Sequence, residues 1–300
     1  MSLKWHKSSL KNFSISDLER FSRVKAHTLR MWERRYAMLQ PLRSAGNVRM
    51  YPLAELEKLL QVAVLNRHGY RISEIYKMKG TAIQTALQAL EADSAHLEKA
   101  LAELTVCMYA CQPEKITQHL NRLRKAWPLE ILVESIIYPF LYNTSLLWIG
   151  NKLYEEHITV TAVRQKLQYA IEGLQVPEDS ASSILLFLTD TKQLDLGLLY
   201  SHYHFKRRGF KVLYLGNDIT LLNLKSALQF HSFNYIFTYL RNNGHSYVDE
   251  LLSVISHYSP ASTLVIGEYE LLSANPVHTN KMLRLPFTEA LHAVENRVKR

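Results

Sequence analysis

The sequence predicts a multidomain protein of mixed α and α/β class, and three observations support this fold class. Basic residues concentrate in the first 80 positions, helical periodicity runs through residues 82–176, and short apolar runs alternate with helical segments from Ser182 onward. A chain of 300 residues is long enough for two or three domains, each with its own core. The predicted domains are an N-terminal module (1–80), a helical bundle (81–177) and a Rossmann-like, flavodoxin-like parallel sheet domain (178–300).

The charge distribution predicts a nucleic-acid partner. Residues 1–80 contain 16 Lys and Arg against 6 Asp and Glu, a net charge of +10, so the other 220 residues carry −1 of the total of +9. A basic module joined to a neutral body is typical of nucleic-acid-binding proteins. A basic membrane-surface helix is the alternative, but it needs one long amphipathic stretch, and here the charges interleave with turn signals.

The sequence gives no indication of membrane association. It has no apolar run long enough to span a bilayer, and its first residues lack the apolar centre of a signal peptide. Two cysteines provide no disulfide framework and fit a reducing compartment. We therefore expect a cytoplasmic protein.

Residues 14–37 predict two short helices joined by a tight turn. Ser14 is placed as an N-cap before a helix whose apolar face includes Leu18 and Phe21. After the turn SRVK, a second helix is expected from about Ala26 to Ala37, with Leu29, Trp32 and Tyr36 facing inward and the basic residues outward. This is the pattern of a helix-turn-helix, whose second helix enters the major groove.

The next residues predict a wing. Pro41 ends the second helix, Gly46-Asn47 is a hairpin turn signal, and Leu42 is expected to pair with Val48 across it. A hairpin with exposed arginines suits DNA phosphates. Helices should follow from Pro52 to Gly69 and over ISEIYKM. The residues predicted to contact DNA are His27, Thr28, Arg30, Arg34, Arg43, Asn47, Arg49 and Tyr51.

The order SISDLE, HTLRMWERRY, PLRSAGNVRMYPLAELEKLL and HGYRISEI resembles the winged helix-turn-helix of the MerR family over residues 13–79. The string WERRY resembles the form found in MerR regulators that carry a cobalamin-binding C-terminal region. The resemblance implies a transcriptional regulator that binds a double-stranded DNA operator as a homodimer or tetramer, with RNA polymerase as a further candidate partner.

Residues 82–176 predict a bundle of four helices. These are AIQTALQALEADSAHLEKALAEL, PEKITQHLNRLRKA, PLEILVESIIYPFLYNTSLLWIG and a last helix to about Leu174; Pro113 and Pro128 mark starts and Gly150 a stop. Cys107 and Cys111 are spaced i,i+4 and could share a ligand. No His or acid joins them, so small buried hydrophobes are the favoured interpretation.

The resemblance extends into this bundle. In the cobalamin-binding regulators a tryptophan, nine residues and then Glu-His cap the upper face of the corrin. Here Trp148 precedes Glu156 and His157 by only seven intervening residues. A Glu and a His at a helix start also serve as ordinary capping and dipole partners, and both interpretations stay open.

The C-terminal third predicts an open parallel sheet. SSILLFLTD, KVLYLG, NYIFTYL and STLVIGEY are buried-strand runs, with helical segments from Leu194, Leu221, Ser246 and Glu289. Ligands of such sheets bind at the carboxyl ends of the strands. The stretch LTDTKQLDLGLLYSHYHFKRRGFKVLYLGNDI resembles the first strand, ligand loop, helix and second strand of the cobalamin-binding domain.

The sequence departs from that family at the positions that would bind the cofactor. The family's lower axial histidine stands three residues before its glycine, where this chain has Leu194 before Gly197, and leucine has no lone pair for a metal. The family's Gly-Gly, which admits the nucleotide tail, is Gly267-Glu268 here, and Tyr239 is bulky where the family is small. The candidate cofactor positions are Trp148, Glu156, His157, Leu194, Gly197, Tyr239, Gly267 and Glu268.

No nucleotide-binding loop, nucleophile elbow or metal-hydrolase spacing is present, so we predict no catalytic residues, no metal ligands and no enzyme activity. The predicted function is a DNA-binding regulator whose sensor domain resembles a cobalamin-binding domain but lacks the usual His ligand. No cofactor is established, and cobalamin is the candidate. Two alternatives are a working light-responsive, adenosylcobalamin-dependent repressor, with His157 as a ligand, and a corrinoid-dependent enzyme component. The basic N-terminal module argues against the latter.

Overall fold

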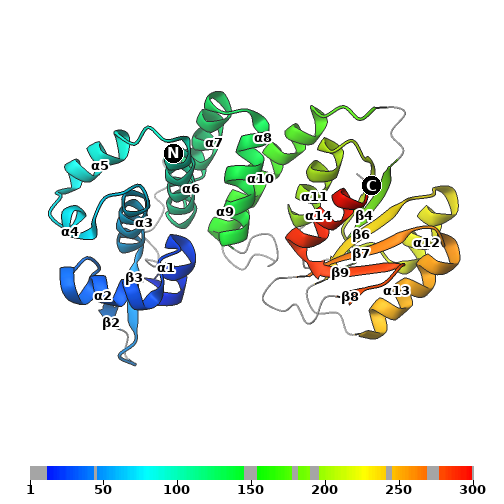
Figure 1. Ribbon diagram of the computed structural model, residues 1–300, viewed down its shortest axis with the longest axis horizontal. Coiled ribbons are helices and arrows are strands. Elements are labelled where there is room, and N and C mark those ends of the chain that lie inside the picture. The colour runs from blue at the N-terminus through cyan, green and yellow to red at the C-terminus, as the bar shows by residue number, and fades with distance from the viewer. Residues whose placement is uncertain are drawn as a thin grey trace, which may run out of the picture. The chain divides into compact units, whose positions relative to one another are not determined.

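Figure 1 shows a computed structural model of the chain, which describes residues 12–43, 46–144, 154–177, 182–189, 196–240, 245–268 and 277–298. The chain divides into two compact units: residues 1–144 with 153–162, and residues 145–152 with 163–300. The boundary between the units lies within helix α10 (Tyr154–Glu172). The division into three functional domains stays a prediction. Within the described ranges, no helix is long and apolar enough to cross a membrane.

The start of the first unit is a winged helix-turn-helix, as predicted. Its elements are β1 (Asn12–Phe13), α1 (Ile15–Ser22), α2 (Ala26–Tyr36), β2 (Leu42–Arg43), β3 (Arg49–Pro52), α3 (Leu53–Arg67) and α4 (Ile72–Ile75). Ser14 caps α1 reciprocally: its hydroxyl accepts from the Asp17 N–H at 3.1 Å, and Asp17 accepts from the Ser14 N–H at 2.9 Å. Ala37 closes α2 in the left-handed region, and Gly69 ends α3 at φ +99°.

The wing is a three-stranded sheet in the order β1-β3-β2. Its register differs from the prediction, because Leu42 pairs with Met50 and Arg43 with Arg49. The predicted pair of Leu42 with Val48 is therefore wrong, and both of these side chains are more than half exposed. The hairpin packs through the other face of β3, where Tyr51 is fully buried, so no apolar cross-strand pair is needed at the tip.

The remaining helices of the first unit continue to Asn143, and α10 begins at Tyr154. They are α5 (Gly80–Gln88), α6 (Asp93–Tyr109), α7 (Pro113–Ala126), α8 (Leu129–Ile131), the π-helical turn η1 (Leu132–Ile137) and α9 (Tyr138–Asn143). The single helix predicted across residues 82–104 is wrong, because residues 89–92 break it into α5 and α6. Both helices pack on α3. The break is not visible in the sequence, because Leu90 and Glu91 lie within it and are strong helix formers.

The two cysteines do not share a helix face. Helix α6 ends at Tyr109, Cys107 is half-buried, and Cys111 is exposed with a φ of 53°. The prediction of two small buried hydrophobes at i,i+4 is therefore wrong for Cys111.

Helix α6 joins the DNA-binding module to the bundle. The ring of Tyr109 packs edge-on against Phe13 and Phe21, with centroids 5.0 and 5.5 Å away. Arg67 adds a polar link, because its Nε donates to Glu98 on α6 at 2.8 Å and its Nη1 donates to the carbonyl of Ser22 at 2.8 Å. These contacts tie the winged helix-turn-helix to the bundle within one packed unit.

The second unit is an α/β/α sandwich (Figure 1). Its sheet has the order β5-β4-β6-β7-β9-β8. The strands are β4 (Ser183–Phe187), β5 (Lys211–Gly216), β6 (Tyr235–Leu240), β7 (Thr263–Glu268), β8 (Val277–His278) and β9 (Met282–Pro286). The helices are α11 (Leu196–Arg207), α12 (Leu221–Phe230), α13 (His245–Tyr258) and α14 (Phe287–Val298).

The four predicted strands form, and β9 adds a fifth parallel strand that the sequence reasoning missed, with β8 antiparallel at the edge. Residues 282–286 alternate between half-buried and buried positions, a weaker signal than the continuous apolar runs of β4 and β7. Helices α12 and α13 cover one face of the sheet over a core that includes Leu185, Phe187 and Ile266. Helices α11 and α14 pack together on the other face.

Candidate functional site

The recognition helix α2 presents a basic surface on the side opposite its core contacts. Leu29 and Trp32 are buried at 0% and 4% exposure and attach the helix to its domain. His27, Arg30 and Arg34 are exposed, and Thr28 is half-buried beside them. A helix held by one apolar side leaves its charged side available to a DNA groove.

Glu33 fixes the wing to the recognition helix. Its carboxylate accepts from Arg49 Nε at 3.0 Å and from the hydroxyl of Tyr51 at 2.9 Å, so one acid on α2 holds two residues of β3. Burial, and then the hydrogen bond to Glu33, raise the pKa of Tyr51 to about 12, so this phenol stays a donor. Sequence reasoning placed no role on Glu33, the one acidic residue in the string WERRY.

Tyr51 therefore does not belong to the DNA-contacting surface, and its assignment there is wrong. Its side chain has 0% exposure and its hydroxyl is committed to Glu33. The other wing residues remain exposed: Arg49 keeps 45% of its side chain in solvent, and Arg43 donates to the side chain of Asn47. Asn47 adopts a φ of 59° in the turn, which suits Asn.

We expect Glu33→Ala to lower the free energy of unfolding by about 1–3 kcal/mol, because it leaves the buried Tyr51 hydroxyl without an acceptor. Glu57→Ala is the matched control: it removes an exposed acid from α3 and changes the net charge equally. Its effect should stay within about 0.5 kcal/mol. Urea unfolding of both variants measures the difference, and equal stabilities would contradict the role of Glu33.

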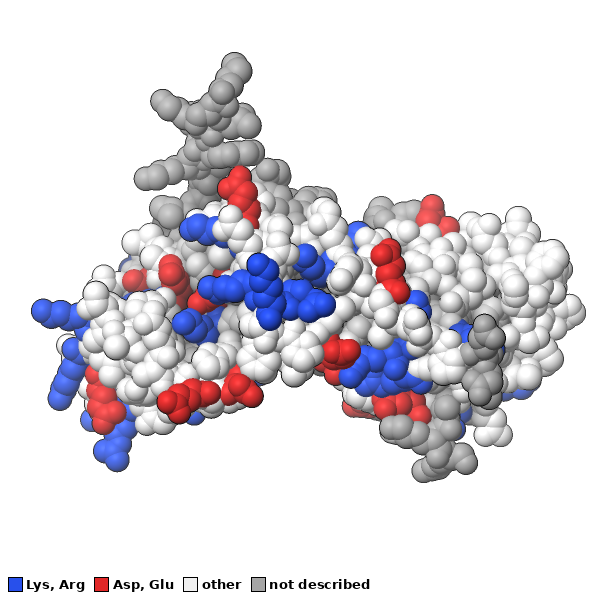
Figure 2. All heavy atoms as spheres, turned by 90° about the horizontal axis from the view of Figure 1, so that it is seen from above, with Lys and Arg blue, Asp and Glu red and all other residues white. Residues whose placement is uncertain are grey.

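Figure 2 draws one face of the molecule, on which Lys and Arg side chains are interspersed with Asp and Glu side chains. We therefore take the individual exposed basic residues of α2 and the wing as the candidate DNA-contacting surface.

In the second unit, aromatic side chains fill the carboxyl end of the sheet. Tyr239, near the end of β6, is 2% exposed, and its ring lies against Gly197 at the start of α11. A Cβ added at Gly197 would lie 3.2 Å from atoms of that ring. The same ring packs edge-on against Phe287, with centroids 5.8 Å apart. The absence of a side chain at Gly197 thus leaves room for the ring of Tyr239.

The Gly267-Glu268 pair at the end of β7 is also committed to internal contacts. A Cβ at Gly267 would lie 3.1 Å from Phe287, so this glycine admits a core aromatic. Glu268 is 6% exposed, and its carboxylate accepts from the guanidinium of Arg284 on the neighbouring strand β9. Sequence reasoning missed Arg284 because it missed β9.

The other candidate cofactor residues are less well defined. Trp148 and Leu194 lie outside the described residues. Glu156 and His157 lie in α10, and only their backbone is described. Gly197, Tyr239, Gly267 and Glu268 lie at one end of the sheet, in contact with one another or with the core. These internal contacts do not fit an open channel that would admit the nucleotide tail of a corrinoid.

Comparisons with known proteins identify the DNA-binding module and relatives of the longer chain. Residues 13–80 match the family model described as MerR HTH family regulatory protein. The HTH-type transcriptional repressor CarA of Myxococcus xanthus is 26% identical over 215 residues, 71% of each chain. The HTH-type transcriptional repressor CarH of the same organism is 22% identical over 226 residues, 73% of this chain and 75% of its own length.

Among solved structures, the monomethylamine corrinoid protein of Methanosarcina barkeri covers 67% of this chain and 99% of its own, at 10% identity and a TM-score of 0.46. The matches to CarA and CarH are much longer than the DNA-binding module, so they extend into the rest of the chain.

The exposed basic helix, the wing held beside it by Glu33 and these matches define the class of DNA-binding transcriptional regulators. Within that class, residues 13–80 form a MerR-type DNA-binding domain, and the chain is similar over most of its length to HTH-type transcriptional repressors.

Proposed function

We propose that this regulator binds operator DNA as a homodimer or tetramer, with α2 in the major groove and the wing on the phosphates. The observation that carries the proposal is the Glu33 contact, which holds the wing in a defined position beside the exposed face of α2. Paired modules supply the two half-sites that helix-turn-helix proteins read. RNA polymerase is a further candidate partner, and we infer no enzymatic role, because the relatives are transcriptional repressors.

Replacing Arg30 and Arg49 separately tests the DNA assignment. Arg30→Ala should relax base preference at a cost of about 1–3 kcal/mol, as for a lost bidentate base contact. Arg49→Ala should weaken binding to all DNA sequences by the same factor, because phosphate contacts carry no sequence information. It should also lower the slope of log affinity against log salt concentration by about one unit. Binding is measured on operator and random DNA over a range of salt.

Arg124→Ala is the control, because Arg124 is an exposed cation of the bundle helix α7 in the same compact unit. Its DNA affinity should equal that of the parent. If Arg30→Ala and Arg49→Ala also bind like the parent at moderate salt, the assignment of α2 and the wing is wrong.

We further propose that the second unit keeps the architecture of a cobalamin-binding domain but does not hold cobalamin with an imidazole below the cobalt. The packing of Tyr239 against Gly197 and Phe287 supports this, as does the Glu268–Arg284 pair. Leu194 in place of the family's histidine supports it independently. The domain would respond to a different ligand or to a partner protein.

The second candidate is a light-responsive, adenosylcobalamin-dependent repressor that uses His157. The length of the matches to the repressors CarA and CarH favours it, because they extend well beyond the DNA-binding module. The absorption spectrum of the protein mixed with adenosylcobalamin in the dark separates the two candidates.

The bundle is the proposed route by which the second unit influences DNA binding. Tyr109 and Glu98 on α6 contact the DNA-binding module directly, through Phe13, Phe21 and Arg67. A shift of α6 would therefore move the recognition module with it.

A further inference from the structure

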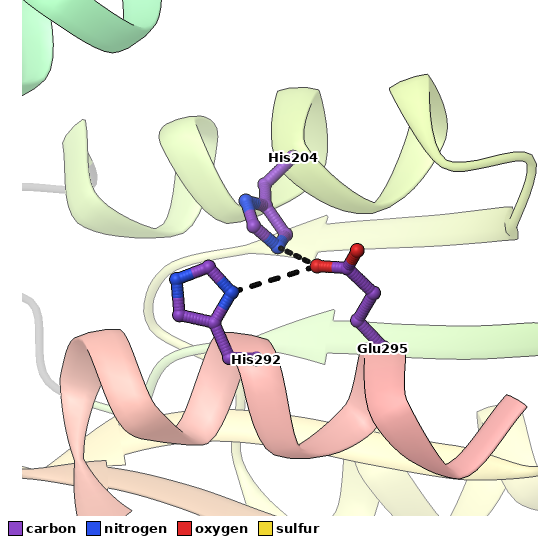
Figure 3. A group of neighbouring side chains, drawn as sticks. All are labelled: His204, His292 and Glu295. Atoms are coloured by element: carbon purple, nitrogen blue, oxygen red, sulfur yellow. Dashed lines mark ion pairs between the residues drawn. The ribbon is translucent and has the colours of Figure 1, made fainter. Parts of the chain in front are cut away.

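Three side chains with metal-binding atoms meet where α11 packs on α14. Figure 3 shows His204 from α11 facing His292 and Glu295 from α14. The ligand atoms all lie within 4.8 Å of one another. Glu295 Oε2 is 3.9 Å from His204 Nε2 and 3.5 Å from His292 Nδ1. The cluster is independent of the DNA-binding surface and of the end of the sheet occupied by Tyr239.

His204 is a buried histidine with an unsatisfied ring nitrogen. Its side chain is only 3% exposed, and its Nε2 atom has no hydrogen-bond partner. The distance of 3.9 Å to Glu295 is too long for a hydrogen bond. A buried polar nitrogen left unpaired costs free energy, so a missing partner is expected.

Two of the three side chains reach solvent. His292 is 56% exposed and Glu295 17%, so an ion can approach from the solvent side of the two helices.

We propose that His204, His292 and Glu295 form a zinc site that links α11 to α14. Two imidazoles and a carboxylate are ordinary zinc ligands, and three protein ligands leave a fourth position for water. In a tetrahedral site with bonds of about 2.0 Å, ligand atoms lie about 3.3 Å apart. The observed separations of 3.5 and 3.9 Å are close to this, and no pair of ligand atoms is more than 4.8 Å apart.

Arg208 is both a supporting group and a competitor. Its Nε donates to Glu295 Oε2 at 2.8 Å, the carboxylate oxygen that faces both histidines. Ligating carboxylates commonly accept such a hydrogen bond from an outer residue. The guanidinium charge also opposes a cation, so replacement of Arg208 should strengthen zinc binding.

The test is zinc binding by the full chain carrying Cys107→Ser and Cys111→Ser, which removes competing thiols. Competition against a chromophoric chelator should reveal one zinc ion per chain, and His292→Ala should weaken its binding about tenfold or more. His292 is exposed, so this variant should fold normally. His257→Ala is the control, because it removes an exposed histidine from α13 of the same unit and should leave zinc affinity unchanged.

Two further measurements test the site. Arg208→Met should raise the zinc affinity, and cobalt(II) bound at the site should give visible absorption bands that disappear in both His292→Ala and His204→Gln. The proposal is overturned if the cysteine-free chain binds no zinc at millimolar concentration, or if His292→Ala binds it as tightly as the cysteine-free chain.

Discussion

Arg284→Met should lower the free energy of unfolding by about 3–5 kcal/mol, because it leaves the carboxylate of Glu268 buried without its counter-charge. Glu268 is 6% exposed at the end of β7, and Arg284 on β9 supplies its ion pair. Urea unfolding followed by circular dichroism measures the loss. Since the chain has two compact units, the transition of the second unit is the one that should move.

Two controls identify the cause of that loss. The double variant Glu268→Leu/Arg284→Met removes both charges and should recover most of the stability, because an apolar pair can replace a buried ion pair at little cost. Arg297→Met removes an exposed cation from α14 and should change the stability by no more than about 0.5 kcal/mol. A loss below about 1 kcal/mol for Arg284→Met would contradict the packing role of the pair.

The unmodified chain should not retain adenosylcobalamin. We expect no corrinoid absorption after gel filtration in the dark and an unchanged thermal midpoint, since a ligand stabilises only by occupying the native state. The physical reason is twofold: Leu194 cannot ligate cobalt, and the Tyr239 side chain fills the space beside Gly197.

Rescue by substitution tests both requirements together. Leu194→His alone should restore little binding, because Tyr239 still fills the tail space. Combined with Tyr239→Ser and Glu268→Gly it should bind the cofactor, and at a hundredfold excess over the dissociation constant the stabilisation is about 2.7 kcal/mol. Tyr239→Ser/Glu268→Gly without the new imidazole is the matched control. Tight stoichiometric binding by the unmodified chain, with release from DNA by light, would instead establish the photoreceptor candidate.

Local signals in the sequence determined much of the first unit. The N-cap at Ser14, the buried positions Leu29 and Trp32 and the turn at Gly46-Asn47 each act over a few residues, and the helix-turn-helix and wing followed from them. The concentration of positive charge in residues 1–80 is likewise a property of the sequence alone. In the second unit, the four buried strands were predictable because short continuous apolar runs are typical of parallel strands that are buried on both faces.

Only the tertiary structure decided which polar and bulky residues meet. Glu33 and Tyr51 lie 18 positions apart, Glu268 and Arg284 lie 16 apart, and His204 lies on a different helix from His292. Tyr51 was predicted to contact DNA together with the wing residues, but the register of β3 turns it into the core. Pairings of this kind depend on register and helix packing, which arise from the whole fold, so the residue pattern along the chain does not reveal them.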